Sequence, residues 1–118
     1  MKLHVTDDTN GPYIVLADDL YPTHRLLWAD LSNGHRTLLA GFNMVAVGIR
    51  AVGGDWGKVK GLSKVEAGDL GDPLDAFDPH GAVMPALLIA RKLSEEVVTK
   101  AAEHLRPLLG LDEATKGN

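Results

Sequence analysis

The sequence predicts a single α+β domain over residues 1–118, in which an antiparallel sheet of about five short strands (residues 2–52) is covered by one long helix (residues 85–106). Two observations lead to this fold class. In the first half, short β-rich segments and alternating apolar positions stand between turn residues. After residue 84, apolar residues recur in steps of three and four, which is the period of a helix.

Two apolar, β-rich segments, residues 2–6 (KLHVT) and 12–17 (PYIVLA), begin the chain. The polar segment between them ends in Asn10-Gly11, a dipeptide that favours the positive φ angles of a tight hairpin turn. We therefore expect the two segments to pair as an antiparallel hairpin, because a short connection joins neighbouring antiparallel strands.

Residues 25–31 (RLLWADL) and 35–40 (HRTLLA) predict a second hairpin, because Asn33-Gly34 lies between them. Residues 43–53 (NMVAVGIRAVG) predict a further strand, because apolar residues alternate along it with period two. Both faces of the second hairpin carry apolar residues, so we expect it at the centre of the sheet with cover on at least one side.

Residues 53–81 form a Gly-rich and acidic connector between the strand-rich part, residues 1–52, and the helix. Asp-Pro pairs at 72–73 and 78–79 each predict an Asp N-cap followed by proline at the first helical position. We expect one short helical turn after the first pair, with Leu74 and Phe77 packed inward.

A long helix is expected within residues 82–108, from Pro85 to residue 106. Proline suits the first helical turn, and Pro107 disfavours helical geometry in the residue before it. The apolar arc of this helix is wider than a solvent-facing helix requires, which predicts a homodimer or higher homo-oligomer through residues 85–106. The remaining residues, 109–118, are expected to form a flexible tail.

Composition limits the class of protein. The 118 residues are 45% hydrophobic and 24% charged, a balance typical of globular domains. The absence of cysteine excludes disulfides and thiol nucleophiles and favours a cytoplasmic location, and no segment is typical of a signal peptide or a membrane span. The net charge of −4 makes duplex nucleic acid an unfavourable partner.

The loop from Gly53 to Gly61 is the candidate ligand site. Trp56 stands there beside Lys58 and Lys60, and Arg50 precedes the loop, so one aromatic and three cations could hold a small anionic ligand or a protein partner. The loop lacks the spacing and the Ser or Thr of a P-loop. The alternative is a mobile glycine-rich loop in which Trp56 packs on the core.

Aspartates at every third position, followed by His80, form a candidate metal site. Asp72, Asp75 and His80, with Asp78 beside them, could hold Mg²⁺ or Mn²⁺, although the spacing does not match a calcium loop of the EF-hand type. The alternative is that each of these aspartates caps a turn.

Three classes of function follow from these patterns. The first is a small non-catalytic binding or adaptor protein that forms homo-oligomers and needs no cofactor. The second is a divalent-metal-dependent enzyme that uses the Asp72, Asp75, Asp78 and His80 cluster. The third is an acidic inhibitor or nucleic-acid mimic, which the equal numbers of acids and bases after residue 81 disfavour. No serine lies in a G-x-S-x-G motif, so the sequence has no signature of a serine hydrolase. No histidines have the spacing of a local zinc site, so it has no signature of such a site either.

Overall fold

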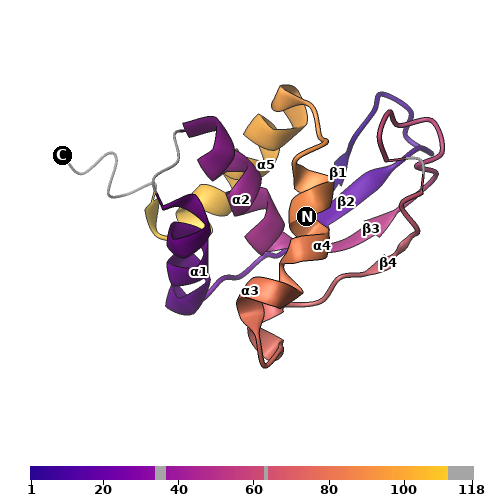
Figure 1. Ribbon diagram of the computed structural model, residues 1–118. Coiled ribbons are helices and arrows are strands. Elements are labelled where there is room, and N and C mark those ends of the chain that lie inside the picture. The colour runs from indigo at the N-terminus through magenta and orange to yellow at the C-terminus, as the bar shows by residue number, and fades with distance from the viewer. Residues whose placement is uncertain (34–36, 63, 112–118) are drawn as a thin grey trace.

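Strands occupy one side of the molecule and most of the helical segments the other (Figure 1). The computed structural model describes residues 1–33, 37–62 and 64–111, and the described strands form one antiparallel sheet in the order β1-β2-β3-β4. The elements are β1 (Lys2–His4), β2 (Tyr13–Leu16), α1 (Pro22–Ser32), α2 (Thr37–Gly48), β3 (Ile49–Gly53), β4 (Gly68–Asp69), η1 (Pro73–Asp75), α3 (Pro79–Ala82), α4 (Met84–Ala90) and α5 (Glu95–Leu108). This is a single α+β domain, as the sequence predicts, but with four strands in the described part and no single long helix.

The first predicted hairpin is confirmed. β1 pairs with β2, and the register places Leu3 opposite Ile14. The predicted turn is wrong, because no residue of the loop has a positive φ angle and the loop closes instead around Asp8. Its carboxylate accepts the Asn10 N–H, and its carbonyl oxygen accepts the Gly11 N–H.

The second predicted hairpin is wrong. Residues 25–31 belong to helix α1, and residues 37–40 begin helix α2. In α1, His24 and Leu27 are buried and Leu31 is half-buried, and these positions have the spacing of one helix face. The exposed Leu26 adds an apolar residue outside this face, so the helical period is not evident in the sequence. Gly34 of the predicted Asn33-Gly34 turn and the first residues of the predicted second strand, 35 and 36, lie outside the described residues.

Helix α2 is the central helix and contacts α1, α4 and α5. Residues 43–48 are all buried, so this part of the helix has no exposed polar face, and its apolar run cannot be told from a buried strand by period. The predicted strand over residues 43–53 is therefore correct only from residue 49, where β3 begins.

The predicted helix over residues 85–106 is two helices, α4 and α5. The break comes at Ser94, whose hydroxyl oxygen accepts the Val97 N–H as the N-cap of α5. At the other end, α5 continues through Pro107 to residue 108, beyond the predicted boundary. The predicted tail begins with a core residue, since Leu109 is buried, and residues 112–118 lie outside the described part.

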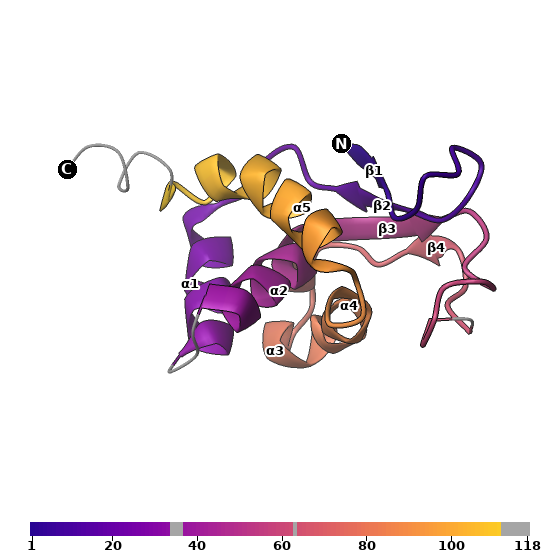
Figure 2. The same cartoon turned by 90° about the horizontal axis from the view of Figure 1, so that it is seen from above.

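α5 lies over α2 when the molecule is seen from above (Figure 2). Its apolar stripe faces the chain's own core, because Val97, Ala101 and Leu105 are all buried. These residues are therefore not free to form the predicted helix-to-helix oligomer. No helix in residues 1–33, 37–62 and 64–111 is long and apolar enough to cross a membrane.

Candidate functional site

The structure does not gather the four predicted ligand residues at one place. Trp56 is buried, and its indole N–H donates to the Gly53 carbonyl oxygen, so its ring packs on the core as the alternative interpretation expects. Lys58 lines a hollow beside the loop of the first hairpin. Lys60 is exposed. Arg50 instead contacts His24 and Asp72, on a different part of the molecule.

The three predicted metal ligands do not converge either. The Asp72 carboxylate accepts the Leu74 N–H as the predicted N-cap of η1, Asp75 is exposed, and His80 lies 3.4 Å from Asp30 of α1. Among the residues that the structure describes, no three His, Asp or Glu side chains lie close enough to hold a metal ion. The capping interpretation of Asp72 is the one that the contacts support.

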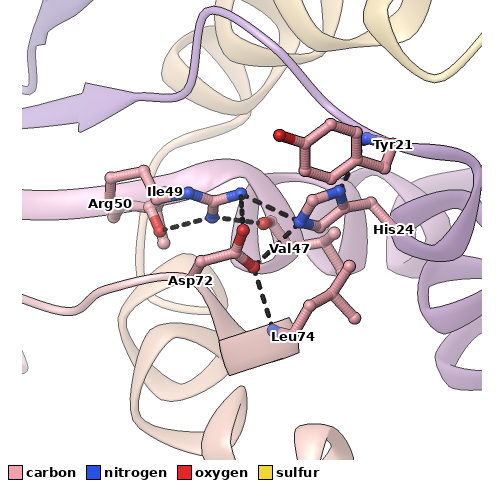
Figure 3. A network of polar contacts seen from close by, with 7 residues as sticks. All are labelled: Tyr21, His24, Val47, Ile49, Arg50, Asp72 and Leu74. Carbon is pink, nitrogen blue, oxygen red and sulfur yellow. Dashed lines mark hydrogen bonds and ion pairs between the residues drawn. The ribbon is translucent and has the colours of Figure 1, made fainter. Parts of the chain in front are cut away.

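A network of polar side chains joins His24, Arg50 and Asp72 (Figure 3). His24 is fully buried, and its Nε2 lies 2.8 Å from Asp72 Oδ1. Its Nδ1 accepts the backbone N–H of Tyr21 at 2.8 Å, while the Tyr21 ring stacks on the imidazole with centroids 5.5 Å apart. Arg50 donates from Nη1 to the Val47 carbonyl oxygen at 2.7 Å.

The hydrogen bonds of His24 fix its tautomer and argue against a catalytic role. Because Nδ1 accepts the Tyr21 N–H, the ring proton lies on Nε2 and is donated to Asp72. Arg50 Nη2, at 3.3 Å from the same Nε2, is then a neighbouring donor and not a hydrogen-bond partner. A general base has to present one ring nitrogen to a substrate, and here both nitrogens are already used.

Charges around Asp72 keep its carboxylate ionised. Burial alone would raise the pKa of Asp72, but the Leu74 N–H, the His24 hydrogen bond and the Arg50 charge together outweigh it, so the pKa lies below its usual range. Burial lowers the pKa of Arg50 against the opposing effect of Asp72 and Asp75. Arg50 remains charged at physiological pH, because a guanidinium titrates far above it.

Sequence reasoning singled out two members of this network, Asp72 as a cap or metal ligand and Arg50 as a ligand-binding residue, but not their contact with each other. Asp72 was predicted as a cap, and it is one, but it also accepts from a histidine 48 positions away. The available signal was His24 at the third position of a helix that starts with Pro22, because Glu or Gln there often accepts the N-cap N–H. Histidine does the same at this helix.

An apolar groove between the connector and α4 is the candidate binding site. Its volume is about 430 Å³, and apolar side chains form most of its surface. Leu88 of α4 is 59% exposed within it. Two lysines, Lys64 and Lys92, complete the lining, which consists of Gly61, Leu62, Lys64, Val65, Pro85, Leu88, Ile89 and Lys92.

Both walls of the groove are held in place by the fold. On the connector side, the Leu62 N–H donates to the Val59 carbonyl oxygen, and the Val65 N–H donates to the Leu62 carbonyl oxygen. Two consecutive turns therefore support this wall. Gly61 has a φ of +81°, a backbone conformation that favours glycine, and it lies beside the stem of Lys92, since a Cβ at Gly61 would be in ordinary contact with Lys92 Cδ at 3.5 Å. The groove therefore exists before any partner arrives.

The lysines of the groove carry unneutralised charge. Neither Lys64 nor Lys92 forms an ion pair with an acid in the described part of the chain. Another hollow, between α2 and α5, measures about 350 Å³, but Glu95, Glu103 and Arg106 line it together. Its charges are of both signs and favour neither sign of ligand, whereas the charged residues that line the groove at α4 are both lysines.

Comparison with known proteins finds no family model, no curated protein and no solved structure that matches this chain. The chemistry of the groove is therefore the basis for a functional proposal.

Proposed function

We propose that this chain is a small protein-binding module that holds an acidic, aromatic-bearing segment of a partner protein in the groove between the connector residues 61, 62, 64 and 65 and α4. The observation that carries the proposal is the combination of an exposed apolar side chain, Leu88, with two lysines, Lys64 and Lys92, that form no ion pair within the described residues. An apolar anchor would remove Leu88 from water, while flanking carboxylates would meet the lysines.

The polar network supports a binding function over a catalytic one. His24 is the fully buried histidine of the described chain and has no nitrogen free for proton transfer. The groove itself presents apolar side chains and lysines, without a histidine or carboxylate that could act as an acid or base beside them. Such a surface recognises a partner by shape and charge.

The test is fluorescence anisotropy with a short labelled peptide in which one phenylalanine stands between aspartates. We expect Leu88→Asp to weaken its binding at least tenfold, because the substitution removes the apolar side chain and adds a repelling charge. Lys92→Glu is expected to weaken it as well. A peptide with lysines in place of the aspartates should bind poorly, and inorganic phosphate, which has no apolar part, should not compete.

Leu26→Asp is the matched control, because Leu26 of α1 is 64% exposed, close to the value for Leu88, and does not line the groove. This variant should bind the acidic peptide like the unsubstituted chain. Equal binding by the Leu88→Asp and unsubstituted chains, with both folded by circular dichroism, would remove the proposal.

A further inference from the structure

Phe77 is fully exposed, against the expectation from sequence that it packs inward. The reason lies in the backbone, because the short η1 turn ends at Ala76, which is extended with ψ 153° and directs the chain away from the core. Of the two Phe, two Trp and two Tyr in the chain, Phe77 has the most exposed side chain, since Tyr21 stacks on His24 and the others are buried or half-buried. Aromatic side chains, phenylalanine among them, are enriched at protein–protein interfaces relative to the rest of the surface.

Rigid structure on both sides presents this phenylalanine. Before it, the Ala76 N–H donates to the Pro73 carbonyl oxygen, and after it the Ala82 N–H donates to the Asp78 carbonyl oxygen. Asp30 of α1 and His80 of α3 lie 3.4 Å apart, but both are exposed, so this pair adds little to the rigidity of the segment. These backbone hydrogen bonds limit the backbone entropy that is lost when Phe77 binds.

The charges beside Phe77 are acidic. Asp75 and Asp78 flank it in the sequence, and both are exposed. An exposed aromatic between two carboxylates has the chemistry that we propose for the partner of the groove at Leu88, Lys64 and Lys92. Residues 75–78 of this chain therefore match the proposed partner segment.

Phe77 does not occupy the groove of its own chain. Figure 1 places η1 and α3 at the lower edge of the molecule and the connector between β3 and β4, which carries one wall of the groove, at the upper right. Phe77 is fully exposed and does not line the groove of its own chain. A second copy is the molecule that brings segment and groove together.

We infer that this protein associates with itself by inserting Phe77 of one copy into the groove at Leu88 of another, with Asp75 and Asp78 facing Lys64 and Lys92. The inference rests on the proposed function, because it names the acidic, aromatic-bearing partner segment as residues 75–78 of a second copy. The contact joins two different surfaces, so it either closes as a reciprocal pair or continues as an open chain.

Sedimentation velocity over a series from about 10 µM to about 1 mM covers the weak affinities expected of a contact with a single anchor. The unsubstituted chain should self-associate, and Phe77→Ala should weaken the association at least tenfold. Leu26→Ala, which removes another exposed apolar side chain, should leave it unchanged. Phe77 makes few contacts within its own chain, so Phe77→Ala should unfold at the same temperature as the parent.

Exchange of charges identifies the surfaces directly. Lys64→Asp with Lys92→Asp should abolish self-association, and so should Asp75→Lys with Asp78→Lys. An equimolar mixture of the two double variants should associate again, because the reversed groove then meets the reversed segment. Recovery in the mixture is the result expected only if these two surfaces meet each other.

A chain that stays monomeric throughout the series, or a Phe77→Ala variant that associates like its parent, would overturn this inference. The labelled acidic peptide separates that failure from failure of the proposed function. Peptide binding that depends on Leu88, in a chain that stays monomeric, leaves the groove with a partner other than a second copy. No peptide binding and no self-association would remove both.

Discussion

His24 is the side chain on which most contacts of the polar network depend. It accepts from the Tyr21 N–H at the start of α1 and donates to Asp72 before η1. We expect His24→Ala to lower the free energy of unfolding by about 2–4 kcal/mol, because it leaves a cavity and unpaired polar groups. His24→Gln should lose less, since glutamine at this helical position can still accept the N-cap N–H. Urea unfolding followed by circular dichroism measures both.

His80→Ala is the control for this prediction. His80 and its partner Asp30 are both more than half exposed, and exposed pairs contribute little. The free energy of unfolding should therefore change by no more than about 0.5 kcal/mol. A His24→Ala variant as stable as His80→Ala would mean that the network adds nothing to stability.

These residues also show how far sequence alone could lead. The Asp72 cap was predictable, because Asp before Pro is a local signal. The approach of His24 and Arg50 to the same carboxylate was not, because it depends on chain segments that meet only in the folded protein. The groove was unpredictable for the same reason, although its connector wall begins at Gly61, where the loop singled out in the sequence ends.

Among the elements, α2 shows why the local sequence pattern predicted the wrong secondary structure where packing determines it. Its buried apolar run resembles a strand in sequence, whereas the first hairpin was predictable because its segments are short and bounded by turn residues. Gly48 ends α2 against α5, where an added Cβ would lie 2.5 Å from Leu105 Cδ2. Glycine is needed at this position because the two helices approach each other closely, and not because a turn requires its backbone conformation.

Gly48→Ala should therefore destabilise the protein, although alanine is normally the better helix former by about 1 kcal/mol. Leu105 is fully buried, so its side chain would have to repack against its neighbours, and overpacking of a core costs about 1–3 kcal/mol. Gly41→Ala in the same helix is the matched variant, because its Cβ would meet only Val98 Cγ1, at 3.3 Å. Urea unfolding should show Gly48→Ala as clearly the less stable, and equal stabilities would contradict the packing argument.

In the assembled domain, the network connects α1, β3 and the segment before η1, so its ionisation affects global unfolding. Because the folded protein holds the pKa of Asp72 below its unfolded value, the stability that this carboxylate contributes is present above about pH 4 and is lost as the pH falls through the folded pKa. Asp72→Asn should be less stable than its parent at neutral pH, and the difference should shrink as the solution becomes more acidic than about pH 4. Urea midpoints measured from about pH 7 to about pH 2.5 give both curves. The urea midpoints of Asp19→Asn, a control at an exposed position, should follow those of the parent at every pH. A difference in midpoint between Asp72→Asn and the parent that stays constant with pH would show that the carboxylate acts by shape and not by charge.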